Sequence, residues 1–281
     1  MDQTAFVDAY LARLGLPLPE QPDLVSLRAL HAAHLQRVPF ENLSIHLGEP
    51  LSLDREALAE KILHCGRGGF CYELNGLFAE LLTALGYRVT LRAACVWGGE
   101  RLGPPLDHLV LCVECAGDAA TWLADVGFGS HSLYPLRRQP GVDQDDPGGV
   151  FRVEEAGEGD WDVLQNGVPQ YRIEAHPRQR SEFEAMCWYQ QTSPRSHFTQ
   201  RVVCTLQTAG GRVTLSEDRL IRTDEHGKQE TVLAGDEAIL EAYRVNFGIA
   251  LDRVPRRLAG KTAMPWAGGS DGRGSGGGVP G

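Results

Sequence analysis

A cysteine stands where a glycine-rich turn runs into a helix, in residues 67–75, which read RGGFCYELN. From Cys71 onward, apolar residues recur at helical spacing, and Gly86 supplies a stop signal. The first N–H groups of a helix lack partners and carry positive partial charge, so they favour a thiolate over a thiol. Gly68 and Gly69 lack side chains that would block a substrate. The pattern predicts that Cys71 is a nucleophile with a lowered pKa.

A base and a carboxylate follow on two strand-like segments, residues 107–113 and 121–129. His108 opens the first segment, and Asp125 closes the strand-like part of the second. If the segments pair as a hairpin, the start of one lies beside the end of the other. His108 could then take the thiol proton while Asp125 fixes the imidazole tautomer. Each residue alone has a plainer structural explanation, but their conjunction favours a Cys71–His108–Asp125 triad.

Three segments resemble signatures of the arylamine N-acetyltransferase family. They are residues 39–43 (PFENL), 67–75 and 125–129 (DVGFG), in the family's order and spacing, and the similarity covers most of residues 1–250. The resemblance implies acetyl transfer from acetyl-CoA, which serves as the acyl-donor substrate. It also implies that Cys71 is the acetylated nucleophile, that His108 is the base, and that Asp125 orients the imidazole. A core of the papain and transglutaminase type is implied as well.

The implied acceptor is an aromatic amine or hydrazine, and flat apolar side chains suit an aryl ring. We expect the acceptor pocket to be lined by three aromatic residues: Phe40, Trp97 and Phe128. For the coenzyme we expect contacts at Gly127 and Gly129, where absent side chains would let the pantetheine arm pass, and at Phe198. Ordinary packing and a tight turn are the alternative explanations for these residues. No metal is expected.

Arg67 and Glu41 lie in two of the matched segments and carry charges beside apolar neighbours. We expect them to form a partly buried ion pair. Such a pair would tie residues 39–40 to the turn that carries Cys71.

Other chemistries remain open from the residues alone. A Cys-His-Asp site could also belong to an amide synthase, a transglutaminase or a protease with a different acyl substrate, because each begins with thiolate attack on an acyl carbon. A scaffold that only binds an aromatic ligand is a further alternative. Cys112 and Cys115 form a CxxC pair, but no second Cys or His pair follows at zinc-ribbon spacing, so we expect two unpaired thiols.

Composition favours a cytoplasmic enzyme. The seven cysteines are scattered and odd in number, which suits a reducing compartment. The N-terminus carries no secretory signal, and no apolar stretch approaches the length of a membrane span. The net charge is −10 and no basic stripe occurs, so neither nucleic acid nor a membrane is expected as a partner. No oligomeric state follows from the sequence.

The order of elements predicts an α+β fold. Residues 1–86 favour a helical domain that carries the nucleophile, with helices over residues 4–14, 26–37, 54–64 and 71–85. Residues 87–195 favour an antiparallel β-barrel domain that carries His108 and Asp125, in which Pro169 indicates an edge strand. Residues 196–267 favour an α/β lid with a helix over residues 236–246. The glycine-rich residues 268–281 are expected to be a disordered tail.

Overall fold

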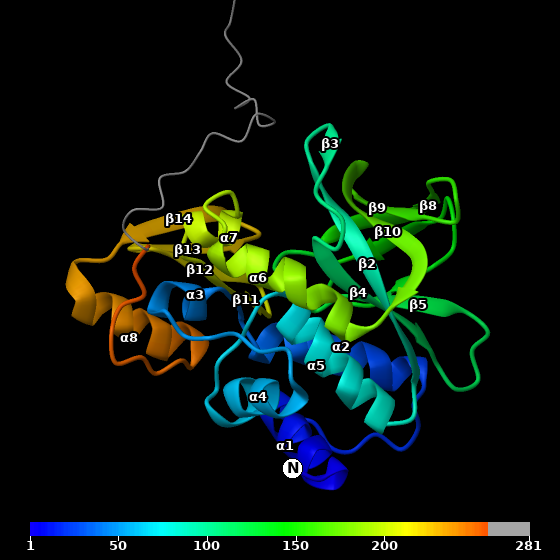
Figure 1. Cartoon of the computed structure of the whole chain (residues 1–281), viewed down its shortest axis with the longest axis horizontal. Helices are drawn as coiled ribbons and strands as arrows, with labels where there is room; N and C mark the ends of the chain where they lie inside the picture. The colour runs from blue at the N-terminus through cyan, green and yellow to red at the C-terminus, as the bar shows by residue number, and fades with distance from the viewer. Residues whose placement is uncertain (258–281) are drawn as a thin grey trace, which may run out of the picture.

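In the computed structural model, which describes residues 1–257, the chain begins with helices that lie below two sheets (Figure 1). These elements are α1 (Gln3–Leu14), α2 (Leu24–Arg37), α3 (Leu43–Leu47), α4 (Arg55–Ala59), a π-helix (Glu60–His64) and α5 (Cys71–Ala84). Asp2 and Asp23 cap α1 and α2 by accepting hydrogen bonds from the Ala5 and Ser26 N–H groups. The four predicted helices are confirmed, although the third is α4 continued by the π-helix.

The middle part is a nearly closed antiparallel sheet, as predicted. Its strand order is β6-β5-β4-β2-β10-β9-β8-β7, with β3 paired to β2. The strands are β2 (Arg88–Gly98), β3 (Arg101–Leu102), β4 (His108–Glu114), β5 (Thr121–Ala124), β6 (Leu136–Arg137), β7 (Asp143–Asp146), β8 (Gly149–Glu155), β9 (Trp161–Gln165) and β10 (Val168–Arg178). A bridge between Pro140 and Val153 brings the chain after β6 against β8, which nearly closes the barrel.

The strand that contains Pro169 lies inside this sheet, so the prediction of an edge strand is wrong, although Pro169 itself pairs only with Leu164. Its strand, β10, is hydrogen-bonded to β2 on one side and to β9 on the other. The register between β9 and β10 shifts between Pro169 and Tyr171. The pairing of β10 with β2 begins only at Tyr171, so a residue that has no N–H to donate is tolerated at the start of this strand.

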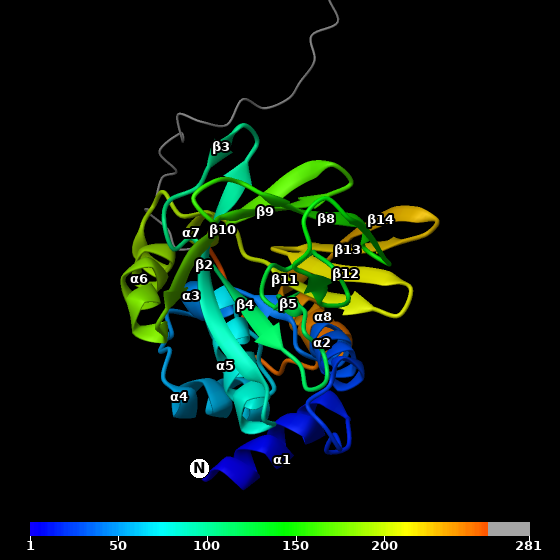
Figure 2. The same cartoon turned by 90° about the vertical axis from the view of Figure 1, so that its right-hand side faces the viewer.

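The last part is a second sheet with one long helix. After a short 3-10 helix (Arg180–Phe183) come α6 (Glu184–Thr192), α7 (His197–Gln200), β11 (Cys204–Thr208), β12 (Gly211–Ser216), β13 (Arg219–Asp224), β14 (Gly227–Val232) and α8 (Gly235–Phe247). The sheet order is β1-β11-β12-β13-β14, and its first strand, β1 (Phe40–Glu41), comes from the N-terminal part. Figure 2 shows the strands of this sheet on the right, with α8 below them.

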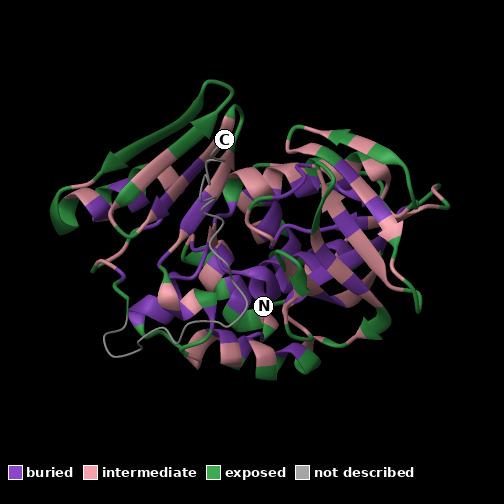
Figure 3. Cartoon of the chain, turned by 90° about the horizontal axis from the view of Figure 1, so that it is seen from above, coloured by how far each residue is buried: buried purple, intermediate pink, exposed green. Residues whose placement is uncertain are grey.

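Strand β4 is where the helices and the barrel meet. Leu111 and Val113 pack into the core formed with α1, α2 and α5, whereas Val110 and Cys112 face the barrel interior. Burial on both faces explains why this strand is apolar throughout, and Figure 3 shows the buried residues concentrated in this central region. The strand therefore fixes His108, its first residue, against both cores.

Two sequence predictions are not settled by these elements. The division into domains at residues 86 and 195 stays a prediction. The predicted tail, residues 268–281, lies outside the described residues. Among residues 1–257, no helix is long and apolar enough to cross a membrane.

Candidate active site

Cys71 is the first residue of α5, and it is buried. A backbone hydrogen bond from Leu109, the neighbour of His108, reaches its thiol. Gly127 lies against its backbone, because a Cβ at that position would be 2.7 Å from the Cys71 Cα. The segments that carry His108 and Asp125 therefore both contact the residue predicted to be the nucleophile.

His108 and Asp125 form a buried pair. The Nε2 atom of His108 lies 2.7 Å from Oδ2 of Asp125. The predicted hairpin is confirmed: β4 and β5 pair antiparallel, with Leu111 opposite Ala124. Burial by itself would raise the pKa of Asp125, but the charge and hydrogen bond of His108 lower it more, so the pKa lies below its usual value. Asp125 is thus held as a carboxylate facing an imidazole.

Asn75 also holds this carboxylate, a role not predicted from the sequence. Its Nδ2 atom donates to Oδ1 of Asp125 at 2.8 Å and to the Leu109 carbonyl at 2.6 Å. Its Oδ1 atom accepts from the Val126 N–H at 2.8 Å. Asn75 stands one helical turn after Cys71, and this i, i+4 spacing is the signal that could have found it.

His31, on α2, is the second supporting residue that was missed. Its Nε2 atom accepts from the Asp125 N–H at 3.1 Å, and its Nδ1 atom lies 2.9 Å from the Leu133 carbonyl. These partners require the neutral tautomer with hydrogen on Nδ1. Burial lowers the pKa of His31, which favours the same neutral form. Only the folded chain brings His31 to this place, so no sequence signal was available.

Burial raises the pKa of the Cys71 thiol, and the Asp107 and Asp125 carboxylates raise it further. The hydrogen bond from Leu109 lowers this pKa, but by less than burial raises it. The predicted lowering of this pKa is therefore wrong. The start of α5 is also occupied by a buried anion, because the Glu73 carboxylate accepts from the Phe70 N–H at 3.1 Å. A thiolate at Cys71 thus requires proton transfer to a neighbouring base within the site.

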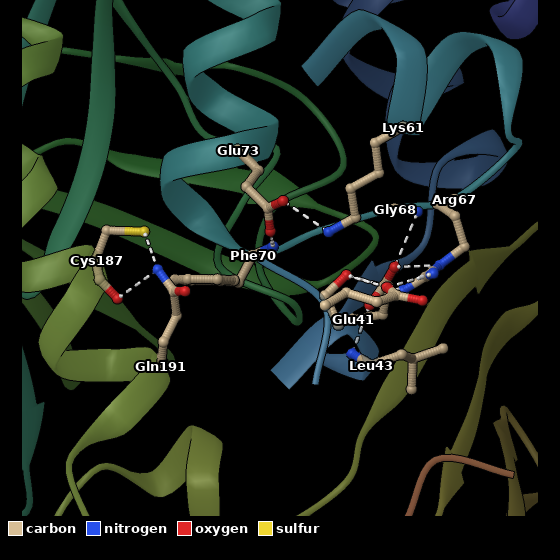
Figure 4. A network of polar contacts seen from close by, with 11 residues as sticks. Glu41, Leu43, Lys61, Arg67, Gly68, Phe70, Glu73, Cys187 and Gln191 are labelled. Carbon is tan, nitrogen blue, oxygen red and sulfur yellow. Dashed lines mark hydrogen bonds and ion pairs between the residues drawn. The ribbon is translucent and has the colours of Figure 1, made fainter. Parts of the chain in front are cut away.

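A polar network supports the turn before Cys71 (Figure 4). The Glu41 carboxylate is buried and accepts from Nε of Arg67 at 3.0 Å, so the predicted ion pair is confirmed. The Glu41 N–H donates to the Gly69 carbonyl at 2.8 Å, which ties β1 to the turn. A second pair, Lys61 with Glu73 at 2.6 Å, was not predicted. Both pairs lie under the helix start that carries Cys71.

Gly68 and Gly69 serve packing inside the protein. A Cβ at Gly68 would lie 1.8 Å from the Pro39 carbonyl oxygen, and one at Gly69 would lie 2.6 Å from Oε2 of Glu73. The space that their absent side chains leave is therefore filled by the chain itself. Packing accounts for both glycines, and a substrate path beside them stays a prediction.

Aromatic rings pack against His108 and against Phe70, the residue before Cys71. The Phe128 ring lies edge-on to His108 at 5.3 Å between centroids. Phe198 packs against Phe70 at 5.0 Å and against Phe40 at 6.1 Å. Trp97 lies further along β2, where its Nε1 atom donates to Asp162 at 3.3 Å. Acceptor contacts for Phe40, Trp97 and Phe128 stay predictions.

The two predicted coenzyme glycines have close neighbours. A Cβ at Gly127 would meet Nδ2 of Asn75 at 2.8 Å, and one at Gly129 would lie 3.3 Å from the Phe40 ring. Gly129 has a φ of +90°, which side chains rarely tolerate. Packing and backbone conformation therefore account for both glycines. Their contact with pantetheine, and that of Phe198 with the coenzyme, stay predictions.

The CxxC residues lie in different cores. Cys112 packs inside the barrel, whereas Cys115 packs with the helices. Both thiols are free. Residues 1–257 contain no group of three or more His, Cys, Asp or Glu side chains that could hold a metal ion.

Comparison with known proteins gives the family. A family model described as N-acetyltransferase matches residues 23–256. The chain is 32% identical to the arylamine N-acetyltransferase / N-hydroxyarylamine O-acetyltransferase of Salmonella typhimurium, over 89% of this chain and 91% of that protein. It is 35% identical to the arylamine N-acetyltransferase of Mycolicibacterium smegmatis, over 88% and 93% of the two chains.

Solved structures agree with the sequence matches. The M. smegmatis arylamine N-acetyltransferase superposes with a TM-score of 0.81 at 33% identity, covering 89% of this chain and 92% of that one. The Mycobacterium marinum enzyme in complex with CoA superposes with a TM-score of 0.78 at 30% identity, covering 86% and 92%. Sequence and fold together show that the chain belongs to the arylamine N-acetyltransferase family.

Proposed function

We propose that the protein acetylates arylamines, arylhydrazines or related aromatic amines with acetyl-CoA, by a ping-pong mechanism through an acetyl-cysteine at Cys71. The observation that carries the proposal is the buried His108–Asp125 pair beside the start of α5. Family membership supports the aromatic acceptor, and the CoA complex of the M. marinum relative supports the donor. The proposed core is of the papain and transglutaminase type.

In the first half-reaction, His108 takes the proton of the Cys71 thiol. Because Asp125 engages Nε2, the ring nitrogen left for this proton is Nδ1. The thiolate then attacks the thioester carbonyl carbon of acetyl-CoA. A bond forms from Cys71 to this carbon, the bond to the coenzyme sulfur breaks, and the departing CoA thiolate takes the proton from His108. The N–H of Cys71, at the start of α5, is a donor for the oxyanion.

In the second half-reaction, the acceptor nitrogen attacks the acetyl-cysteine. His108 takes the proton that the attacking nitrogen loses, and Asp125 stabilises the resulting imidazolium. The amide product leaves when the bond to Cys71 breaks, and the proton on His108 restores the thiol. Asn75 and His31 keep Asp125 in place during both steps through the hydrogen bonds described above.

Mass spectrometry of the intact protein tests the proposal. Incubation with acetyl-CoA alone should add one acetyl group to the peptide that contains Cys71, and an added arylamine should remove it as the amide. Cys71→Ala should abolish both events, whereas Cys65→Ala, at an exposed cysteine, should retain them. Amine acetylation by Cys71→Ala, or a label on another cysteine, contradicts the proposal. A protease or transglutaminase would show no productive reaction with acetyl-CoA, and a binding scaffold would show no acetylation at all.

A further inference from the structure

Arg212, on β12, is a cation held by neutral groups. Its Nη1 atom donates to the Gly129 carbonyl and, at 3.3 Å, to Oγ1 of Thr205. Its Nη2 atom donates to Oε1 of Gln207 at 3.4 Å. The guanidinium therefore connects the second sheet with the segment that carries Asp125.

No carboxylate neutralises this cation. Within residues 1–257 Arg212 forms no ion pair, and burial lowers its pKa with no acidic side chain acting to raise it. Its directly paired neighbours in the sheet, Gln207 on β11 and Thr223 on β13, are both neutral. A charge taken out of water costs free energy unless a partner compensates it, and arginine in such places is typically paired with a carboxylate or a phosphate. The chain thus leaves a partly buried positive charge available to an anion.

The guanidinium also has N–H groups left for such an anion. Its Nε atom donates to no group within residues 1–257, so the hydrogen bonds described above leave part of its donor capacity unused. Arg212 is half-buried and not enclosed, so a ligand can reach it. The planar fork of a guanidinium matches the oxygens of a phosphate group.

Arg212 lies within reach of the candidate active site. A Cβ at Gly127 would be 2.7 Å from the Cys71 Cα, and Gly129, whose carbonyl binds Arg212, follows shortly after Gly127. The segment from Gly127 to Gly129 spans at most about 7 Å, and the pantetheine arm of acetyl-CoA is about as long as an extended tetrapeptide. The phosphates of acetyl-CoA begin where this arm ends. A donor whose thioester meets Cys71 can therefore bring a phosphate to Arg212.

We propose that Arg212 binds a phosphate group of acetyl-CoA, and that it thereby selects donors with the nucleotide end over simple acetyl donors. The inference rests on the proposed acetyl transfer and assigns a residue to the recognition of its donor. Charge-assisted hydrogen bonds from a guanidinium to phosphate oxygens are strong, and partial burial strengthens them further because little water screens the charges.

The test compares binding of CoA with acetyl transfer from a donor that has no phosphate. In Arg212→Gln the side chain keeps an N–H donor for the Gly129 carbonyl but loses its charge. The Kd of CoA, measured by isothermal titration calorimetry, should rise about tenfold or more. The ratio of kcat/KM for acetyl-CoA to that for p-nitrophenyl acetate should fall by a similar factor. Arg222→Gln, at an exposed arginine that binds Asn246 on α8, is the matched control and should change neither quantity.

A second variant tests the same charge with Arg212 in place. Gln207→Glu has nearly the same shape and puts a carboxylate beside Nη2 of Arg212, which supplies the counterion that the guanidinium lacks. The Kd of CoA should rise in this variant as well, because the carboxylate competes with the phosphate. Where Arg212→Gln does not fold, an unchanged Kd in Gln207→Glu overturns the proposal.

Two further donors identify the group that Arg212 binds. Acetyl-dephospho-CoA lacks the 3′-phosphate, so an effect of Arg212→Gln that persists with it assigns the diphosphate, and one that disappears assigns the 3′-phosphate. S-acetylpantetheine carries no phosphate. Equal losses with acetyl-CoA, S-acetylpantetheine and p-nitrophenyl acetate would show that Arg212 only holds the Gly129 carbonyl in place, which overturns the proposal.

Acetylation of Cys71 by acetyl-CoA, measured without acceptor, separates this inference from the proposed function. If the native protein is not acetylated, the proposed function fails. If it is acetylated and the Kd of CoA does not respond to Arg212→Gln, only the role of Arg212 fails.

Discussion

Asp125 accepts hydrogen bonds from three different parts of the chain. His108 on β4 and Asn75 on α5 donate from their side chains, and Gly127 donates its backbone N–H at 3.0 Å. A fourth contact, from His31 on α2, holds the Asp125 backbone. One carboxylate therefore connects α5, which carries Cys71, with β4, which carries His108.

Replacing this carboxylate should remove the activation of His108 while keeping its shape. In Asp125→Asn the amide cannot stabilise an imidazolium and favours the wrong imidazole tautomer, which in a serine triad costs about ten-thousandfold in kcat. We expect a loss of similar size in arylamine acetylation, measured at saturating acetyl-CoA. Asp8→Asn serves as the control. Turnover close to normal would rule Asp125 out as the orienting residue.

Reactivity of Cys71 should depend on His108 rather than on the start of the helix. Burial raises the pKa of Cys71 as it does for the other six cysteines, so no thiol is activated by its environment alone. His108→Asn should therefore slow alkylation of Cys71 to the rate of the other buried cysteines. Peptide mapping after a limiting dose of alkylating agent measures this, with His226→Asn, at an exposed loop, as control. An unchanged alkylation rate would mean that the start of α5, and not His108, activates the Cys71 thiol.

At the scale of elements, the turn before α5 depends on two buried ion pairs. Arg67 with Glu41 connects the turn to β1, and Lys61 with Glu73 connects the π-helix to the first turn of α5. Burial lowers the pKa of Lys61, but the Glu73 and Glu41 carboxylates raise it more, so its ammonium stays charged. The position of Cys71 is thus set by charges that come from four separate segments.

Removal of one member should be costly, because it leaves an unpaired buried charge. Glu41→Ala should lower the free energy of unfolding by about 3–5 kcal/mol, measured by urea denaturation. Glu20→Ala, at an exposed position, is the control and should change it by less than about 0.5 kcal/mol. Equal effects of the two substitutions would mean that the pair does not stabilise the turn.

Local signals explain which elements the sequence predicts. Asp2 and Asp23 are capping residues, and the strands of the β4–β5 hairpin show alternating or fully apolar patterns, so these elements were found. Strand β1 has only two residues, and it exists because Phe40 and Glu41 pair with Thr205 and Cys204. Helices α6 and α7 were missed as well. Long-range pairing decides such elements, and a single sequence does not display it.

Some residues of the candidate site likewise have a local signal in the sequence, and others have none. Cys71, His108 and Asp125 are marked by residue type and position, and Asn75 by helical spacing. His31 and Lys61 are brought in by tertiary packing, which leaves no local pattern. The sequence predicts a lowered thiol pKa because the effect of a helix start is local, whereas the burial that raises this pKa is a property of the whole fold.

At the scale of the whole molecule, histidines buried between its layers make stability depend on pH. Burial lowers the pKa of His131 to about 4, although the charge of Asp125 acts to raise it. Burial also lowers the pKa of His31, His34 and His46. A lowered folded-state pKa means that the unfolded chain binds more protons below pH ~6.5. The stabilisation is therefore complete above pH ~6.5 and is lost as the pH falls toward 4.

The contribution of His131 can be isolated. Its ring packs among Phe128, Phe151 and Tyr171, so His131→Phe keeps an aromatic ring there without a titrating group. The loss of unfolding free energy between pH 6.5 and pH 4 should shrink by about 3 kcal/mol in this variant. Urea denaturation at both pH values measures it, with His226→Phe as control. An equal loss in the variant and the unmodified protein would contradict the assignment.

Pairing of β1 with β11 also affects the order in which parts of the protein fold. The Val203 N–H donates to Oδ1 of Asn42 at a separation of 161 residues, immediately beside the β1–β11 pair. We therefore expect β1 to lack its strand partner during synthesis until the ribosome has released β11. Contacts of such long range are slow to form. Because β1 is hydrogen-bonded to the turn that carries Cys71, we expect this turn to be completed late in folding.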